Sequence, residues 1–334
     1  MKRVLLAEPR GFCAGVERAV AAVLQALDAY GPPVYVRKHI VHNMHVVADL
    51  EARGTIFVES EHEVPEGARL VLAAHGVAPS VHRNAAARRL ATVDATCPLV
   101  TKVHAEVRRF AATGYRIILI GHAGHDEVVG TTGQAPEAIT LVETAAQARA
   151  IGVPEAQKLA YVTQTTLSVD ETSEIIAILR RRFPRIVGPR KEDICYATTN
   201  RQLAVKQMLH EIDALLVVGS QESSNSNRLV DTARAGGVPA WLIEDASEMD
   251  ARVVARYETI GLTSGASTPA QIVRGVCDWF RERGVTICSF GPASTENVVF
   301  RLPPGLSVSA DRRTPGNVDP TVSSRSATRV SRTG

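Results

Sequence analysis

The 334-residue sequence lacks the features that mark membrane, secreted and nucleotide-binding proteins. No apolar run is long enough to span a membrane, and Glu8, Pro9 and Arg10 interrupt any signal-peptide core. Neither a P-loop nor a G-x-G-x-x-G motif is present, so no nucleotide phosphate is indicated. Aromatic residues make up only 4%, and no basic face accompanies them, which argues against nucleic-acid binding. We expect a cytoplasmic protein that binds neither membrane nor nucleic acid.

Cysteine is also scarce, and its placement is the main clue to the architecture. The five cysteines are odd in number and widely spaced, which argues against a disulfide scaffold and fits a reducing cytoplasm. Three of them, Cys13, Cys97 and Cys195, directly precede a predicted amphipathic helix, which is followed by an apolar strand. A polar cluster then follows 28 or 29 residues after each cysteine. The chain is therefore a degenerate threefold repeat with one thiol per unit.

Each repeat alternates apolar strands with helices, which predicts parallel sheets covered by helices. We predict an α/β fold of three pseudo-threefold-related domains, each with a small, mainly parallel sheet, around a common centre. The predicted domains are residues 14–96, 97–193 and 194–285. Terminal strands in residues 1–13 and 286–310 would pack on the repeats, and residues 311–334 would form a disordered Arg/Ser/Thr-rich tail.

The three repeat cysteines share one position, whereas Cys277 falls within a predicted helix and Cys288 within a predicted strand, where we expect packing or incidental roles. A helix N-terminus lowers the pKa of a thiol, and three converging thiolates require a metal. Zinc normally has four protein ligands in spacings that are absent here. Three thiolates on an iron–sulfur cluster would leave one iron open to bind a substrate oxygen. We favour the cluster, with zinc as the alternative.

Polar clusters follow two strands of each repeat, where ligands bind in open α/β sheets. Imidazole, hydroxyl and amide donors around one centre suit an oxyanion such as a diphosphate. Glu127 is the only carboxylate expected near the centre, and burial without a cationic partner would make it a proton donor near neutral pH. The clusters contain His42, His75, His122, His125, Gln164, Thr165, Thr166, Ser223 to Asn227 and Ser267.

Several segments together resemble one known family, the 4-hydroxy-3-methylbut-2-enyl diphosphate reductases, which complete the methylerythritol phosphate route to isoprenoids. The resemblance extends from about residue 4 to residue 302. Glu8, where the family more often has a small or amide residue, and the tail beyond about residue 310 depart from it. The matching segments are PRGFCAGV, HIVHN, AAHGV, DATCPLVTKVH, GHAGHDEVVGT, VTQTTLSVD, IVGPRKEDICYATTNRQ, VVGSQESSNSNRL and TSGAS.

The resemblance implies one central [4Fe-4S] cluster per chain, held by Cys13, Cys97 and Cys195. It also implies catalytic roles near the substrate hydroxyl for Glu127 and Thr165, with Glu127 in the proton-delivery network, and a further catalytic role for His125. The implied substrate-binding residues are His42, His75, His125, Thr165, Ser223, Ser224, Asn225 and Ser267.

The implied reaction is reductive dehydroxylation of (E)-4-hydroxy-3-methylbut-2-enyl diphosphate to isopentenyl diphosphate and dimethylallyl diphosphate. Two electrons would pass through the cluster, whose unique iron binds the substrate hydroxyl. A ferredoxin or flavodoxin is the implied electron donor, because the sequence has no flavin or nicotinamide motif. Two alternatives stay open. A hydro-lyase of the aconitase type would need no external electrons, and an iron–sulfur sensor would not need the oxyanion donors.

Overall fold

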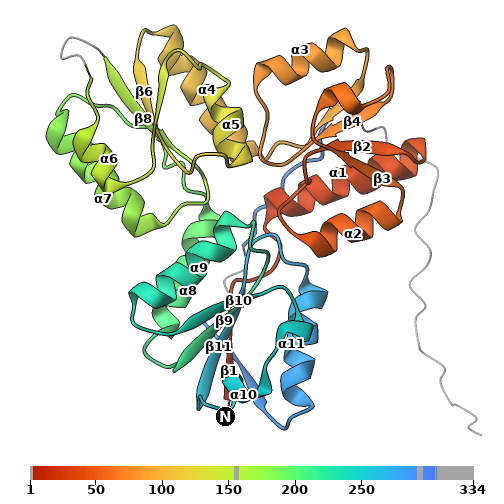
Figure 1. Ribbon diagram of the computed structural model, residues 1–334, viewed down its shortest axis with the longest axis vertical. Helices are drawn as coiled ribbons and strands as arrows, with labels where there is room; N and C mark the ends of the chain where they lie inside the picture. Colours follow the sequence, from red (N-terminus) through yellow and green to blue (C-terminus); the bar gives the residue numbers. More distant parts are fainter. Residues whose placement is uncertain (1–2, 154–157, 292–295, 305, 307–334) are drawn as a thin grey trace, which may run out of the picture.

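Three lobes surround a common centre in the computed structural model, which describes residues 3–153, 158–291, 296–304 and 306 (Figure 1). Each lobe has its own sheet, and every strand pairing in the three sheets is parallel. The predicted α/β fold class is therefore confirmed. Within this part of the chain, no helix has the length and apolar character needed to cross a membrane. The predicted tail, residues 311–334, lies outside the described residues.

The first lobe has a four-stranded sheet in the order β3-β2-β4-β5. Its longest helix, α1, buries Ala19, Ala22, Val23 and Ala26 completely, and their spacing of three and four residues forms one apolar face against the sheet. The elements are α1 (Ala14–Tyr30), β2 (Val34–Arg37), α2 (Met44–Ala52), β3 (Thr55–Val58), the 3-10 helix η1 (Glu61–Glu63), β4 (Arg69–Leu72), α3 (Pro79–Ala87) and β5 (Ala91–Asp94).

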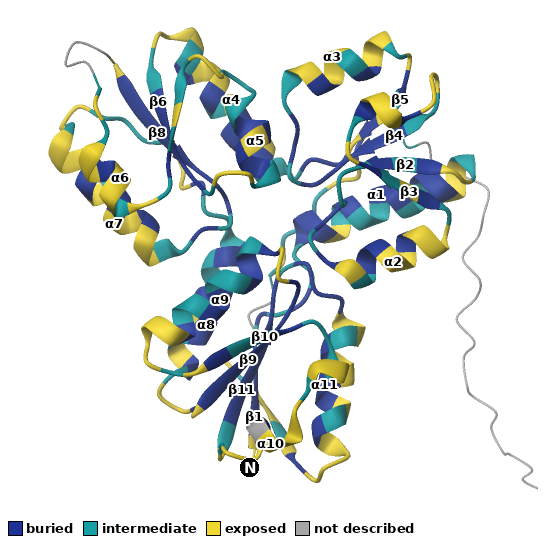
Figure 2. Ribbon diagram, in the orientation of Figure 1, coloured by how far each residue is buried: buried dark blue, intermediate teal, exposed yellow. Residues whose placement is uncertain are grey.

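The second lobe has a three-stranded sheet in the order β7-β6-β8. Every residue of β8 is buried, as expected for an apolar strand whose two faces are both covered by helices (Figure 2). The elements are α4 (Pro98–Ala112), β6 (Arg116–Ile120), α5 (Asp126–Thr132), β7 (Ile139–Val142), α6 (Ala145–Ala150), β8 (Leu159–Thr163) and α7 (Val169–Arg182).

The third lobe has a five-stranded sheet in the order β10-β9-β11-β1-β12, so the N-terminal strand β1 lies between two strands from the end of the chain. In this lobe Cys277 is buried in α11, and Cys288 is exposed on the edge strand β12. The elements are β1 (Arg3–Ala7), α8 (Tyr196–Met208), β9 (Ala214–Val218), α9 (Ser224–Ala235), β10 (Ala240–Ile243), the 3-10 helix η2 (Ala246–Glu248), α10 (Ala251–Val254), β11 (Thr259–Ser264), α11 (Ala270–Arg281) and β12 (Thr286–Phe290).

The chain passes from one lobe to the next at each repeat cysteine. Strand β5 of the first lobe leads to Cys97, which begins α4 of the second lobe. The segment around Val187, which bridges to β8 of the second lobe, leads to Cys195 and the third lobe. Strand β1 of the third lobe leads back to Cys13 and the first lobe. Each cysteine therefore lies at a junction between two lobes.

Candidate functional site

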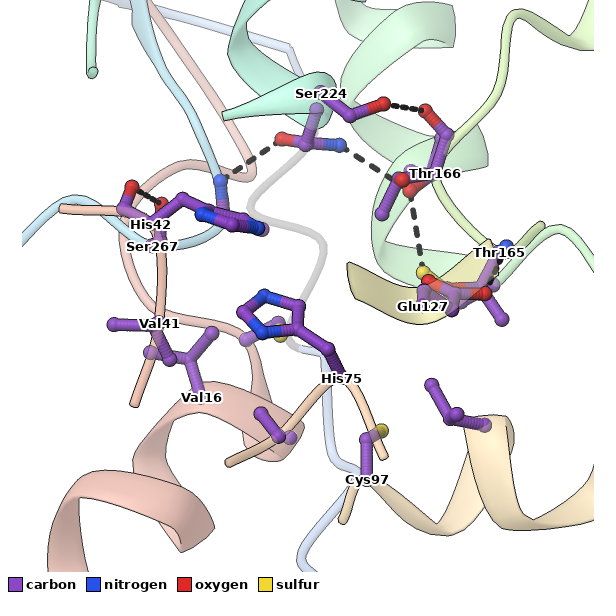
Figure 3. A pocket seen from close by; sticks show the side chains of 18 of the residues that line it. Val16, Val41, His42, His75, Cys97, Glu127, Thr165, Thr166, Ser224 and Ser267 are labelled. Atoms are coloured by element: carbon purple, nitrogen blue, oxygen red, sulfur yellow. Dashed lines mark hydrogen bonds between the residues drawn. The ribbon is translucent and has the colours of Figure 1, made fainter. Parts of the chain in front are cut away.

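All twelve residues that the family resemblance implies for the site line one central pocket, which encloses about 690 Å³ of space between protein atoms, part of it open to solvent (Figure 3). Apolar side chains, Val16, Val41, Leu99 and Val100 among them, form part of the wall. The twelve residues are Cys13, His42, His75, Cys97, His125, Glu127, Thr165, Cys195, Ser223, Ser224, Asn225 and Ser267.

The three cysteines occupy equivalent positions in the pocket wall. Cys13, Cys97 and Cys195 are the N-cap residues of α1, α4 and α8, and no side-chain capping hydrogen bond holds their sulfurs. Their backbone N–H groups donate to carbonyl oxygens at the ends of strands that belong to the preceding lobe. The acceptors are Ala266 at 3.1 Å, Ala74 at 2.9 Å and Thr165 at 3.0 Å, respectively. The predicted threefold repeat is thus present in the hydrogen bonds around the pocket.

Burial raises the pKa of all three thiols, to about 12 for Cys97 and about 11 for Cys195, and in the same direction for Cys13. Backbone N–H groups at the helix starts lower the pKa, but loss of solvent is the larger effect. The helix N-termini thus act in the predicted direction, but burial outweighs them, and the thiols by themselves are not held as thiolates. A metal cation would supply the charge that holds them as thiolates.

The three thiols border open space in the pocket. A single zinc ion at about 2.3 Å from each sulfur would bring all sulfur pairs within about 4.6 Å. Among the described residues, the three thiols do not form a group with all ligand atoms within 4.8 Å. Gly15 leaves room between two of them, because a Cβ there would lie 2.8 Å from the Cys97 sulfur and 3.7 Å from the Cys13 sulfur. Three thiols that border this space are a donor set that an iron–sulfur cluster can use.

Three histidines of the pocket wall face one another. The ring centroids of His42 and His75 are 4.1 Å apart, and His125 lies 5.2 Å from His42 and 5.9 Å from His75. Burial lowers the pKa of all three, to about 4 for His125 and well below the ordinary value for His75. Both ring nitrogens of His42 and the Nδ1 atom of His75 are buried without a hydrogen-bond partner. Unpartnered buried polar atoms cost about 1–3 kcal/mol each, so this cluster suits a polar ligand.

Asp126 is a pocket neighbour that the sequence analysis did not single out. Its carboxylate and one nitrogen from each of His42 and His75 all lie within 4.8 Å of one another. The prediction that Glu127 is the only carboxylate near the centre is therefore wrong. Two imidazoles and a carboxylate are also a set that can bind zinc or iron. The only sequence signal for Asp126 is its position beside Glu127 at the start of α5.

Glu127 and Thr165 form a buried acid–hydroxyl pair. The backbone N–H of Thr165 donates to Glu127 Oε1 at 2.6 Å, and its hydroxyl donates to Oε2 at 2.9 Å. Burial raises the pKa of Glu127 to about 7, although both bonds from Thr165 act in the opposite direction. His125 accepts the Glu127 N–H at 3.1 Å and caps α5. Glu127 can therefore exchange a proton near neutral pH.

The polar loop before α9 is held by bonds to other parts of the protein. Asn225 accepts the Ala266 N–H at 2.9 Å and donates to the Thr198 hydroxyl, which lies 3.2 Å from the Cys195 sulfur. Sequence reasoning missed Thr198, whose signal is its place three residues after the cysteine on α8. Asn225 thus connects the loop to a thiol.

The serines of the pocket are also engaged. Ser223 caps α9, Ser224 donates to the Thr166 carbonyl at 3.1 Å, and Ser267 donates to the His42 carbonyl at 3.0 Å. His122, which the sequence analysis grouped with the site, lines a neighbouring pocket instead.

The sequence is similar to proteins of one known family. A model of the family described as LytB protein matches residues 4–281. A relative from Acidothermus cellulolyticus, named 4-hydroxy-3-methylbut-2-enyl diphosphate reductase, is 58% identical over 306 residues, covering 91% of this chain and 90% of the relative. A protein of the same name from Mycolicibacterium paratuberculosis is 54% identical over 303 residues, covering 90% of this chain and 91% of the relative.

Two solved structures agree with these relatives. The E-1-hydroxy-2-methyl-but-2-enyl-4-diphosphate reductase of Plasmodium falciparum superposes with a TM-score of 0.89 at 39% identity, covering 91% of this chain and 96% of that chain. A structure named (E)-4-hydroxy-3-methyl-but-2-enyl diphosphate reductase, the terminal enzyme of the non-mevalonate pathway, gives a TM-score of 0.61 at 30% identity. The match covers 84% of this chain and 100% of that chain.

Proposed function

The chain belongs to the LytB family, and from this membership we propose that its central pocket reduces 4-hydroxy-3-methylbut-2-enyl diphosphate to isopentenyl diphosphate and dimethylallyl diphosphate. The chain is an oxidoreductase of isoprenoid precursor synthesis. One observation carries the assignment of the reaction to this pocket: three thiols, three imidazoles and one buried acid line it together.

The cofactor of the proposal is one [4Fe-4S] cluster per chain, with Cys13, Cys97 and Cys195 as its protein ligands. When bound, such a cluster supplies electrons and an iron without a protein ligand that can accept an oxygen. The equivalent N-cap positions of the three cysteines and the space beside Gly15 support this assignment.

The diphosphate of the substrate would be held by the histidines and the polar loop before α9. His42 and His75 offer buried ring nitrogens that have no partner, and an anion close to them would offset the burial that lowers their pKa. The loop before α9 and Ser267 would supply further hydroxyl and amide groups. Those predicted to bind are Ser223, Ser224, Asn225 and Ser267.

Glu127 and Thr165 would deliver a proton to the leaving oxygen. In its acid form Glu127 donates to the Thr165 hydroxyl, which in turn donates to the substrate oxygen, so that the oxygen leaves as water. His125 positions the acid by accepting its backbone N–H. The reaction consumes two electrons and two protons, and the second proton is added to carbon at either end of the allyl group, which yields the two products.

Electrons would come from a ferredoxin or flavodoxin, because the sequence has no flavin or nicotinamide motif. Residues 14–96, 97–193 and 194–285 would be the three domains, and β1 and β12, which lie outside these ranges, complete the sheet of the third. A cytoplasmic location would suit the five free cysteines.

The test is anaerobic purification followed by iron and sulfide analysis and turnover assays with and without a dye reductant. We expect iron and sulfide in the protein, and product formation only when the reductant is present. Turnover without reductant would favour a hydro-lyase, and bound iron without turnover would favour a sensor. Either result contradicts the proposed reaction.

A further inference from the structure

A cation on α1 bonds to the backbone just before the second cysteine. Arg18 lies five residues after Cys13, and its Nη1 atom donates to the carbonyl of Thr96 at 3.0 Å. Thr96 immediately precedes Cys97. The Nε atom of the same side chain donates to the carbonyl of Arg301 at 2.8 Å. Arg18 therefore connects α1, the helix that begins at Cys13, to the segment directly before Cys97.

The equivalent cation on α4 reaches the backbone before the third cysteine. Lys102 lies five residues after Cys97, and its ammonium group donates to Asp193 Oδ1 at 2.9 Å. The Asp193 side chain is fully buried, lies two residues before Cys195, and accepts the Thr163 N–H at 2.9 Å. The ammonium group also donates to the carbonyls of Lys191 and, at 2.8 Å, Glu192. Three acceptors thus satisfy its three N–H bonds.

The third cation, Arg201, bonds to the backbone before the first cysteine. Arg201 lies on α8 six residues after Cys195, its side chain is fully buried, and its Nη2 atom donates to the carbonyl of Gly11 at 2.9 Å. Gly11 lies two residues before Cys13. The Nη1 atom donates to both carboxylate oxygens of Glu296 at 3.2 Å, so the buried charge is paired. These bonds explain why Arg201 is buried on a helix that was predicted to be simply amphipathic.

We propose that Arg18, Lys102 and Arg201, which we call the cation ring, are positioning residues that set the triangle of the three thiols and thereby the retention and reduction potential of the cluster. This inference rests on the proposed iron–sulfur function. Because each cysteine lies at a junction between two lobes, movement of one lobe shifts a sulfur relative to the other two. Each member of the ring lies on the helix that follows one cysteine and bonds to the backbone just before another. Arg201, on the helix after Cys195, bonds to the backbone before Cys13.

Two members of the ring also act electrostatically on the thiols, Arg18 on Cys97 and Arg201 on Cys13, and charge next to a cluster alters its potential. Loss of a cation disfavours the more negative reduced state, so the reduction potential should fall. Lys206 provides the matched control. It lies on α8 and also joins two lobes, through an exposed ion pair with Asp170 of α7, but among the described residues it makes no hydrogen bond to those just before a cysteine and does not line the pocket.

The experiment compares the anaerobically purified holoprotein with Arg18→Met, Lys102→Met and the control Lys206→Met. Arg18 is only half-buried, which makes its variant the safer one for folding, whereas Lys102→Met leaves Asp193 unpaired. The measurements are the rate of iron release to a chelator, the reduction potential of the cluster and the melting temperature. We expect release about 10–100-fold faster in both ring variants, with a lower potential, and no change in the control.

Release rates and potentials equal to those of Lys206→Met would overturn the inference. So would faster release accompanied by an unchanged potential and a proportional fall in melting temperature, because that describes general destabilisation. Turnover is scored separately. A wild-type chain that holds the cluster but does not reduce the substrate contradicts the proposed function, and the comparison of iron release among the variants still tests the ring.

Discussion

Replacing the buried acid, Glu127→Gln, separates the chemistry of the pocket from its structure. The amide has nearly the same size, its oxygen can still accept the Thr165 N–H, and its NH₂ group can donate to the Thr165 hydroxyl in place of the bond now made to Oε2. It has no proton to release near neutral pH. We therefore expect the variant to fold, retain iron and bind substrate, but to lose turnover.

The size of the effect follows from the role of the acid and from its burial. General acid catalysis contributes about 10²–10⁴-fold, so kcat should fall by a factor in that range. Burial raises the pKa of Glu127 from 4.5 to about 7, and each pKa unit corresponds to about 1.4 kcal/mol. Ionised Glu127 therefore lowers the stability by an amount on the order of 3 kcal/mol above pH 7.

The sign of this stability effect can be checked against pH. The folded-state pKa is raised, so the contribution of Glu127 is fully present below about pH 4.5 and is lost as the pH rises through about 7. Glutamine does not titrate. The variant should accordingly gain melting temperature relative to the wild type at about pH 8, where it has lost most of its activity, and this gain should disappear at about pH 5.

The assay is anaerobic steady-state kinetics with a dye reductant between about pH 5 and pH 9, together with a substrate-binding titration. Wild-type kcat should decline about tenfold per pH unit above 7 if proton donation limits the rate, whereas the residual rate of the variant should not depend on this ionisation. Glu106→Gln is the control, because Glu106 is mostly buried on α4, is paired with Arg109 and does not line the pocket. Near-wild-type turnover in Glu127→Gln would refute the assignment.

Three other changes probe the remaining parts of the pocket. Gly15→Ala places a Cβ 2.8 Å from the Cys97 sulfur, so we expect at least about tenfold weaker iron retention, and wild-type iron content would show that the space beside Gly15 is not needed. Cys195→Ser should abolish or degrade the cluster while Cys277→Ser leaves iron and sulfide unchanged; equal losses would contradict the special role of the repeat cysteines. His75→Ala should weaken substrate binding by about 1.5–3 kcal/mol, measured as a rise in KM with a smaller change in kcat, and an unaltered KM would remove His75 from the diphosphate site.

Local sequence patterns predicted much of the fold, because strands and helix starts depend on nearby residues. The apolar runs that form β6 and β9 and the cysteine positions at the starts of α1, α4 and α8 follow from periodicity and capping chemistry. The threefold spacing then predicted which polar residues come together. The raised pKa of Glu127 was also predicted from the sequence, because it requires only that the carboxyl be buried without a cationic partner.

Other features depend on which distant segments pack against each other. The insertion of β1 between β11 and β12 is a choice of strand partners about 250 to 280 residues away, which no local pattern specifies. The raised thiol pKa values reflect the depth at which three lobes close over the cysteines, and that depth outweighs the local effect of each helix start. The same closure brings Asp126 to the histidines of another lobe and Arg201 to the carbonyl of Gly11. Local propensities act within a few residues, whereas desolvation and charge pairing act between any groups that the folded chain brings into contact. Only the tertiary structure could therefore decide the strand partners, the thiol pKa values and these contacts.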